Sequence, residues 1–335
     1  MRLIDVILMN DNILKFTIPK GSLQEVVTSF FERAGLKLNF ASTRDYRPSI
    51  GDPEVYIKLL RPQEIPNYLI GEDEFDLGIS GIDWVKETNA DVEVILNLEI
   101  GMVKIVFCVP TTWENINSLD EALKEFSNKK KALRISTEYL TLSLNYIKNN
   151  ATYKKLYGEK APLVITPWKT WGENEKVKIF LSFGATEAKP PEEVDAIIDN
   201  TETGSTLRAN NLKIVEVLDS STAVLIANKY ALKDEWKREK IKDLKVLLMG
   251  VIEASKKLHI FMNVHEDNLN DILVKLPALK RPTISKLAGE NAEGWYAINT
   301  IIKKEDFLSL IPILRKYAQG LVVHEPRQIL PFEKI

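Results

Sequence analysis

The sequence of 335 residues contains a single cysteine, Cys108. One thiol excludes an internal disulfide and a zinc site built from several cysteines. Cys108 lies in the apolar run 103–109, so it is predicted to be a small buried hydrophobic residue. The three histidines, His259, His265 and His324, have neither HxxxH nor HExxH spacing, so no structural metal site is expected.

Long apolar runs and an excess of charge of one sign are also missing. No stretch approaches the ~18 apolar residues that span a bilayer, and Asp5 and Asp11 interrupt the region where a signal peptide would carry its apolar core. Lys and Arg number 45 and Asp and Glu 47, a formal charge of −2, which gives no general attraction for nucleic acid or anionic lipid. The sequence therefore predicts a cytoplasmic protein with no nucleic-acid or membrane partner, in which any anion is bound locally.

The residues that are present are typical of a folded α/β protein. Hydrophobic residues make up 45% and charged residues 27%, as in ordinary globular chains. Short β-branched runs alternate with amphipathic stretches, which predicts mostly parallel sheet. Strands are expected at 13–18, 55–60, 77–79, 92–95, 105–109, 132–136, 163–166, 178–182, 196–198, 214–217 and 223–227, and helices at 23–34, 62–71, from 118, at 140–149 and within 233–258.

The last part of the sequence has a different order of elements. A strand at 260–264, a helix at 268–275, strands at 283–287 and 295–302, a helix at 305–317 and a strand at 321–323 give the order βαββαβ of a ferredoxin-like domain. Earlier in the chain, residues 168–176 lack periodicity and are predicted to form a surface loop. Trp168 and Trp171 in that loop are expected to pack against their domain.

The most informative segment is 194–207, where an apolar strand ends in Asp199 and is followed by Thr203, Gly204, Ser205 and Thr206. Such a turn directs backbone N–H groups and hydroxyls into one concavity, which can hold a phosphate. Asp199 is placed to accept hydrogen bonds from sugar hydroxyls, so the segment predicts a ribose phosphate site. Alternatively, Thr203 or Ser205 only caps a short helix and Asp199 caps a strand. The segment alone leaves both interpretations open.

Six segments follow one another along nearly the whole chain in an order that identifies a family resemblance. These are 18–23, 60–66, 76–83, 134–139, 184–226 and 281–298. Together they resemble the long form of ATP phosphoribosyltransferase, the enzyme family that commits ATP to histidine biosynthesis. Six motifs in one order are far more specific than any one of them.

The resemblance implies a catalytic part with two lobes of the periplasmic-binding-protein type (type II) and a C-terminal ferredoxin-like (ACT-like) regulatory domain. Residues 1–105 and 212–235 would form the first lobe, 106–211 the second lobe, 236–257 a connecting helix and 258–335 the regulatory domain. It also implies that N1 of the ATP adenine attacks C1 of phosphoribosyl pyrophosphate (PRPP) with inversion and loss of pyrophosphate. Mg²⁺ would assist, held mostly by substrate phosphates. Histidine would be a feedback inhibitor, and the chain would form a homo-oligomer, from dimer to hexamer.

The resemblance also assigns roles to individual residues, and Arg61 is further favoured by its place after a strand, at the sheet edge where open α/β folds bind ligands. Catalytic roles fall to Arg61 and Lys20; PRPP binding to Asp199, Thr203, Gly204, Ser205, Thr206 and Arg44; ATP binding to Lys20, Gly21, Gly81, Asp83 and Glu187; and histidine binding to Leu279 and Thr283. No protein ligand is assigned to a metal. On sequence alone Arg61 and Glu187 can equally be solvated loop residues, Gly81 an ordinary turn, and Leu279 and Thr283 core or strand-start residues.

The sequence departs from the family pattern in several places. Ser205 occupies a position where many members have Arg or Thr, and Ser22 one where Arg is common, so the charge that Arg would add is absent at both. Tyr317 stands near a position where small residues are common and could crowd the effector pocket, so retention of histidine inhibition is left open. Two other functions remain: a two-domain module that closes on a small molecule without chemistry, and a regulatory subunit. Neither needs the complete segment from Asp199 to Thr206.

Overall fold

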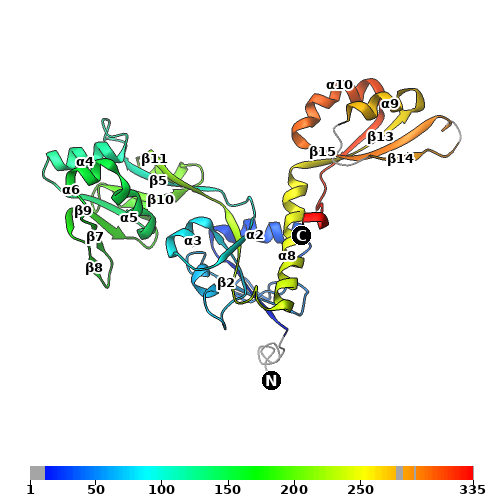
Figure 1. The fold of residues 1–335 in the computed structure, drawn as a ribbon. Helices are drawn as coiled ribbons and strands as arrows, with labels where there is room; N and C mark the ends of the chain where they lie inside the picture. The colour runs from blue at the N-terminus through cyan, green and yellow to red at the C-terminus, as the bar shows by residue number, and fades with distance from the viewer. Residues whose placement is uncertain (1–11, 277–281, 290–291, 335) are drawn as a thin grey trace. The chain divides into compact units, whose positions relative to one another are not determined.

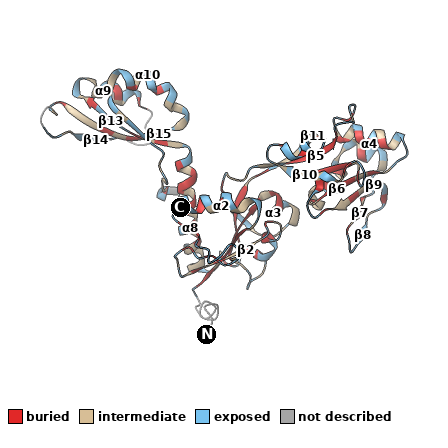
Figure 2. Cartoon of the chain, turned by 180° about the vertical axis from the view of Figure 1, so that it is seen from behind, coloured by how far each residue is buried: buried red, intermediate tan, exposed pale blue. Residues whose placement is uncertain are grey.

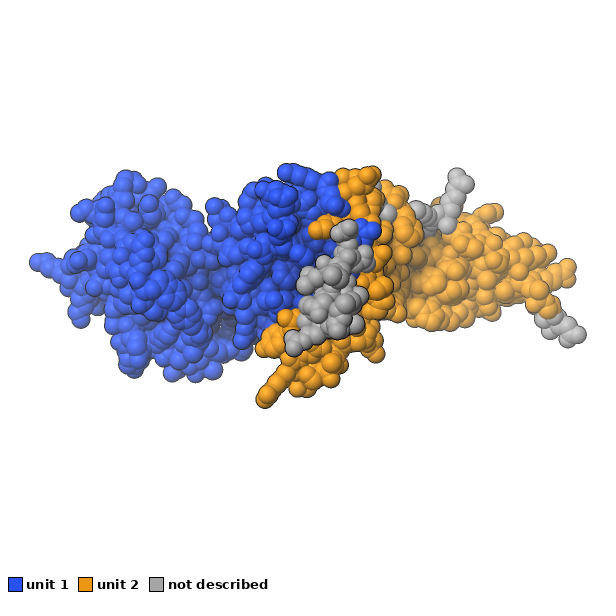
Figure 3. Space-filling model, turned by 90° about the horizontal axis from the view of Figure 1, so that it is seen from below, with its two compact units in different colours: residues 1–26, 55–234 blue, residues 27–54, 235–335 orange. Residues whose placement is uncertain are grey.

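The computed structural model describes residues 12–276, 282–289 and 292–334 (Figure 1). These residues fall into two compact units (Figure 3). The first contains the described residues up to 26 together with 55–234, and the second contains 27–54 and the described residues from 235 onward. Each unit is described by itself below.

The first unit begins with a five-stranded sheet in the order β2-β1-β3-β12-β4. Strands β1, β2 and β3 run parallel, whereas β12 runs antiparallel to both of its neighbours, β3 and β4. The bounds are β1 (Leu14–Pro19), β2 (Val55–Leu60), β3 (Leu77–Gly81), β4 (Glu93–Asn97) and β12 (Ala223–Ala227), with helix α3 (Ile82–Thr88). Helix α2 (Ser22–Arg33) begins in this unit, and its residues from Val27 onward belong to the second unit. Lys20 and Arg61 follow β1 and β2 directly, so both lie at the carboxyl edge of this sheet.

The helix predicted at 62–71 is shorter than expected. Only Ile65–Leu69 is helical, as the 3₁₀ turn η1. Pro62 and Pro66 have no backbone N–H to donate, which limits the segment to a short turn. The turn packs tightly on the sheet, since a Cβ on Gly78 would lie 2.9 Å from Ile65 Cγ2.

The first unit also contains a seven-stranded sheet in the order β11-β5-β10-β6-β9-β7-β8. Strand β6 is parallel to β10 and β9, and β9 is parallel to β7, so the carboxyl ends of these four strands share one edge. The bounds are β5 (Val103–Pro110), β6 (Leu133–Thr137), β7 (Pro162–Ile165), β8 (Thr170–Trp171), β9 (Asn174–Leu181), β10 (Ala196–Thr201) and β11 (Leu212–Ser221), with α4 (Leu119–Asn128), α5 (Leu140–Asn149), α6 (Ala151–Tyr157), η2 (Thr186–Ala188) and α7 (Ser205–Ala209). Buried residues follow its central strands (Figure 2). Cys108 is buried, as predicted, and burial raises the pKa of its thiol to about 12.

Three predictions about this part of the chain are wrong. Residues 168–176 are not a simple loop, because β8 and the start of β9 lie within them, on either side of Gly172. Trp168 does not pack against the core: it is 73% exposed and its ring contacts exposed Phe183 at a centroid distance of 5.9 Å. Segment 212–221 was predicted to belong to the first lobe, yet β11 pairs along its length with β5 of the seven-stranded sheet.

The second unit contains the long helix α8 (Glu235–Ser255) and a four-stranded antiparallel sheet in the order β14-β15-β13-β16. Helices α9 and α10 pack on one face of this sheet through a core that includes Ile260, Ile298 and Leu314. The bounds are β13 (Lys257–His265), α9 (Glu266–Lys275), β14 (Thr283–Lys286), β15 (Trp295–Lys303), η3 (Lys304–Asp306), α10 (Phe307–Tyr317), β16 (Gln319–His324) and η4 (Phe332–Lys334). This is the predicted βαββαβ order.

Candidate active site

A cavity of about 380 Å³ lies at the carboxyl end of β10. It brings together five residues that the sequence predicted to bind substrate, Glu187, Asp199, Thr203, Ser205 and Thr206, and adds Glu138, Asn200, Thr201, Glu202 and Leu207. Glu138 follows β6 and Glu187 lies in η2 after β9. Because these strands are parallel neighbours, their ends converge on one cavity.

The turn that closes the cavity is fixed by Gly204. Its φ of +73° is in the left-handed region, and it is the N-cap of α7 without any side-chain capping bond. Its N–H donates to Thr201 Oγ1 at 2.9 Å, and the hydroxyls of Thr203 and Ser205 are 3.0 Å apart. The N-cap residue is therefore a glycine, and Thr203 Oγ1 accepts from the N–H of Ser205, the first residue of α7, at 3.4 Å.

Asp199 lies in an environment that disfavours its charged form. Burial raises the pKa of its carboxyl to about 6, and the negative charges of Glu138 and Glu187 act in the same direction. Hydrogen bonds from the Asn200 N–H, at 2.7 Å, and from the Thr186 hydroxyl partly oppose this rise. A ligand that donates hydroxyl protons to Asp199 would stabilise the carboxylate.

A second group of predicted residues lies at the carboxyl edge of the five-stranded sheet. Lys20 N donates to the carbonyl oxygen of Leu60 at 2.7 Å, which joins the ends of β1 and β2. Gly21 has a φ of +109°, and a Cβ there would lie 3.1 Å from Arg61 Nη1. Lys20, Gly21 and Arg61 thus lie on neighbouring loops at this edge of the sheet, and their roles stay predictions.

The Arg61 loop also reaches the cavity next to Asp199. Gln63 Nε2 lies 3.4 Å from Glu138 Oε2, and Glu138 lines that cavity. Both groups belong to the first unit. The loop that carries Arg61 therefore contacts one of the carboxylates that line the cavity of Asp199.

Gly81 and Asp83 are both buried, unlike residues that are exposed to contact a ligand. Asp83 is 3% exposed; its Oδ1 accepts from Ser221 Oγ at 2.6 Å and its Oδ2 from the Tyr139 hydroxyl at 2.8 Å. A Cβ on Gly81 would lie 2.0 Å from Asp83 Oδ1, so the glycine makes room for the carboxylate. A direct contact of either residue with ATP stays a prediction.

Comparison with known proteins identifies the family. The ATP phosphoribosyltransferase profile matches residues 61–250, and the profile of the family's C-terminal domain matches 254–325. The chain is 37% identical over 318 residues to the ATP phosphoribosyltransferase of Pelotomaculum thermopropionicum, covering 93% of this chain and 97% of that protein. It is 35% identical to that of Thermodesulfovibrio yellowstonii, covering 96% and 100%. The chain belongs to the ATP phosphoribosyltransferase family.

A solved structure is similar in fold. The ATP phosphoribosyl transferase (HisG:HisZ) complex from Thermotoga maritima superposes with a TM-score of 0.52 at 21% identity, covering 71% of this chain and 97% of that chain. The mixed α/β architecture predicted for the ATP phosphoribosyltransferase family, with a further C-terminal domain, is confirmed. In the described parts of the chain, no helix combines the length and apolar character needed to cross a membrane.

The remaining residues that the sequence analysis singled out lie in the second unit or outside the described residues. Arg44 is exposed in the segment 27–54, and Thr283 is exposed at the start of β14. Leu279 lies outside the described residues. The Tyr317 hydroxyl accepts from Lys275 Nζ at 3.0 Å, and this contact lowers the pKa of Tyr317. The binding roles of Arg44, Leu279 and Thr283, and the effect of Tyr317 on the effector pocket, stay predictions.

Sequence reasoning assigned no role to five residues that also line the cavity, Glu138, Asn200, Thr201, Glu202 and Leu207, or to Tyr139, which contacts Asn200. Glu138 and Tyr139 directly follow the predicted strand 132–136 and lie in a segment that carries the family resemblance. The rule that polar residues at strand ends line ligand sites, applied there, would have found Glu138. The buried contacts of Tyr139 with Asp83 and Asn200 span 56 and 61 residues and leave no local signal.

Proposed function

We propose that this chain transfers the phosphoribosyl group of PRPP to N1 of the ATP adenine, releasing pyrophosphate and forming phosphoribosyl-ATP, the first step of histidine biosynthesis. Family membership over nearly the full length supports this function. The single observation that carries it is the cavity in which Asp199 meets the turn that bears the hydroxyls of Thr203, Ser205 and Thr206. That combination matches a sugar joined to a phosphate.

The reaction forms the N1–C1 bond as the bond from C1 to pyrophosphate breaks. Adenine N1 is a weak nucleophile, so holding the two substrates in line supplies much of the rate. Lys20 and Arg61 would bind the leaving pyrophosphate, whose negative charge grows in the transition state. Asp199 would accept hydrogen bonds from ribose hydroxyls, and the carboxylates of Glu138 and Glu187 would favour the positive charge that develops on the sugar.

Mg²⁺ is proposed to arrive with the substrate phosphates. Within residues 12–276, 282–289 and 292–334, no cluster of three or more His, Cys, Asp or Glu side chains could hold a metal ion. Mg²⁺ commonly binds nucleotide and pyrophosphate oxygens with few protein ligands. No step of the mechanism is assigned to a metal held by the protein alone.

We further propose that the five-stranded and seven-stranded sheets form the two catalytic lobes and that residues 258–335 form a regulatory domain. Histidine inhibition and assembly of dimers into a hexamer are part of this proposal, supported by the match to the family's C-terminal domain. The substrate pair favours a cytoplasmic location. Light scattering with and without histidine measures the oligomer: an unchanged monomer in both conditions would refute the assembly.

The activity is tested by ultraviolet absorbance of phosphoribosyl-ATP when the chain is incubated with ATP, PRPP, Mg²⁺ and a pyrophosphatase. Product is expected, with a loss of about 10²-fold in Asp199→Ala. Asp91→Ala, which removes an exposed partner of Lys229, is the control and should be as active as the wild type. PRPP-dependent thermal stabilisation without any product would instead identify a binding module.

A further inference from the structure

Three side chains form a hydrogen-bonded series that ends beside Asp199. Asp83 is the second residue of α3, Tyr139 precedes α5, and Asn200 follows Asp199 in β10. The Tyr139 hydroxyl lies 2.8 Å from Asp83 Oδ2 and 2.8 Å from Asn200 Nδ2. Asp83 and Tyr139 are buried, and the Tyr139 ring stacks on Trp84 with centroids 4.4 Å apart. The series is therefore rigid at its buried end.

The chemistry of the three groups fixes which atom donates and which accepts in each hydrogen bond of the series. A carboxylate only accepts hydrogen bonds, so the Tyr139 hydroxyl donates its proton to Asp83. Burial and the charge of Asp83 raise the pKa of Tyr139, so the phenol keeps this proton. The Tyr139 oxygen must then accept from the Asn200 amide nitrogen. This leaves the Asn200 carbonyl oxygen, Oδ1, as the end of the amide that is turned away from Tyr139.

Asn200 lies in the right place for that oxygen to meet a ligand. The residue lines the same cavity as Asp199, and its backbone N–H donates to Asp199 Oδ1 at 2.7 Å. Its side chain is exposed, and Oδ1 has no hydrogen-bond partner within the described parts of the chain. The carboxylate of Asp199 and an oriented amide oxygen are thus adjacent acceptors, as neighbouring sugar hydroxyls require.

We propose that Asn200 is a second acceptor for the ribose hydroxyls of PRPP, and that Asp83 and Tyr139 are positioning residues that hold its amide in the accepting orientation. This inference rests on the proposed function of the cavity as a PRPP site. It assigns Asp83 to the support of PRPP binding in place of a direct contact with ATP. An uncharged acceptor also keeps its hydrogen bond at pH values where Asp199 takes up a proton.

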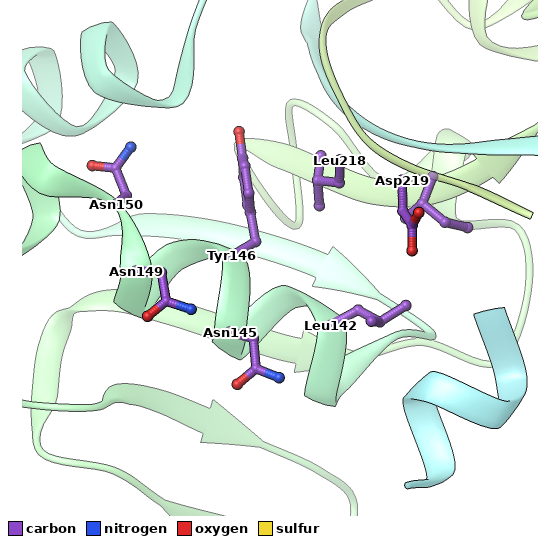
Figure 4. A pocket seen from close by; sticks show the side chains of 8 residues that line it. Leu142, Asn145, Tyr146, Asn149, Asn150, Leu218 and Asp219 are labelled. Carbon is purple, nitrogen blue, oxygen red and sulfur yellow. The ribbon is translucent and has the colours of Figure 1, made fainter. Parts of the chain in front are cut away.

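The test is PRPP binding measured by calorimetry for the wild type and three variants. Asn200→Leu removes the amide and Tyr139→Phe removes only the hydroxyl that orients it, so each should raise the PRPP dissociation constant about three- to tenfold. Tyr146→Phe is the matched control. Like Tyr139, Tyr146 donates its hydroxyl proton to a carboxylate, that of Glu216, and its side chain is partly buried. It lines a different cavity of about 410 Å³ between α5 and β11 (Figure 4), so its PRPP affinity should match the wild type.

A double-mutant cycle separates positioning from general loss of structure. If Tyr139 acts through Asn200, the double variant should bind PRPP no more weakly than Asn200→Leu alone; multiplied effects of the two changes would overturn the positioning role. KM for PRPP should rise in both single variants while KM for ATP stays unchanged. Asn200 is exposed, so Asn200→Leu remains a valid test even if Tyr139→Phe does not fold.

The outcomes distinguish this inference from the proposed function. Wild-type affinity in Asn200→Leu, in a chain whose wild type binds PRPP, would overturn the inference and leave the function standing. A wild type that does not bind PRPP would overturn both.

Discussion

Asp199 shows how one residue combines a structural cost with a binding role. Its carboxyl shares the cavity with those of Glu138 and Glu187, and the described residues lining this cavity include no Lys or Arg. Burial without a cationic partner destabilises the charged form. The site is therefore built for a ligand that supplies hydrogen-bond donors, and the unliganded protein is less stable because of it.

This cost predicts a stability difference that depends on pH. The pKa of Asp199 in the folded chain, about 6, lies above that of an unfolded aspartate, ~4. Between these values the folded state holds a proton that the unfolded state has released, so the free energy of unfolding should fall as pH rises through this window. Asp199→Asn should remove that slope and be more stable than the wild type at pH 8 by about 2 kcal/mol.

Urea denaturation at pH 4.5, 6 and 8 measures both effects. The control is Asp195→Asn, because Asp195 is paired with Arg134 at 2.9 Å, and this variant should lose stability at pH 8. Equal pH slopes in the wild type and Asp199→Asn would contradict the expected titration.

Replacement of Gly204 should abolish the thermal stabilisation of the chain by PRPP. Valine at a φ of +73° is strained by at least ~1 kcal/mol, and its Cβ would lie 3.0 Å from Arg208 Nη1. Gly204→Val should lower the midpoint of thermal unfolding and abolish the stabilisation by PRPP. Gly158→Val is the matched control: its φ of +66° is also positive and its Cβ would enter open space. It should lose stability yet keep the PRPP response.

Among the secondary-structure elements, α5 has an unusual N-terminus. Its N-cap residue, Tyr139, makes no capping hydrogen bond with its side chain. Glu87 of α3 takes over this function, accepting from the N–H groups of Thr141 at 2.8 Å and Leu142 at 3.0 Å. The helix that follows the site is therefore anchored by a residue more than fifty positions earlier in the chain.

Removal of the Glu87 carboxylate should lower the stability of the folded chain. Glu87→Ala leaves two backbone N–H groups without their acceptor and should lower the free energy of unfolding by about 2 kcal/mol. Chemical denaturation measures the loss. Glu125→Ala, which breaks only the exposed pair with Lys129, should cost at most about 0.5 kcal/mol. Equal losses in the two variants would argue against capping by Glu87.

Most strands and helices could be predicted from the sequence because their periodicity is local. Strands β2 and β12 have the predicted bounds, and α5 begins and ends as expected. The segment around β8 could not be predicted from the sequence, because a two-residue strand has no periodicity and forms only by pairing with β7. The same applies to β11, whose place in a sheet depends on its partner β5.

At the scale of the whole molecule, segments far apart in sequence hold the second unit together. Arg327 Nε donates to the carbonyl oxygen of Arg33 at 2.9 Å, and Arg327 Nη2 to that of Glu32 at 2.6 Å. These carbonyls belong to the C-terminal turn of α2, where cations are favoured. Gln328 adds bonds to the carbonyls of Ala34 and Leu247.

Arg327→Ala should therefore lower the free energy of unfolding of the second unit by about 1–2 kcal/mol. Hydrogen exchange of the amides in α2 and α8 reports the loss directly. Arg315→Ala changes an exposed arginine of α10 and should leave this exchange unaltered. Faster exchange in both variants alike would show that charge, and not the contact, is responsible.

The sequence by itself determined the alternation of strands and helices, the βαββαβ order and the hydroxyl-bearing turn after Asp199, because periodicity and turn chemistry depend on neighbouring residues. Only the tertiary structure decided that Glu138 joins this turn, that the Asn200 amide contacts Tyr139 and that Asp83 is buried against Ser221, 138 residues away. Such contacts depend on which strands pair and which helix ends meet. These are properties of the packed chain that no local pattern records.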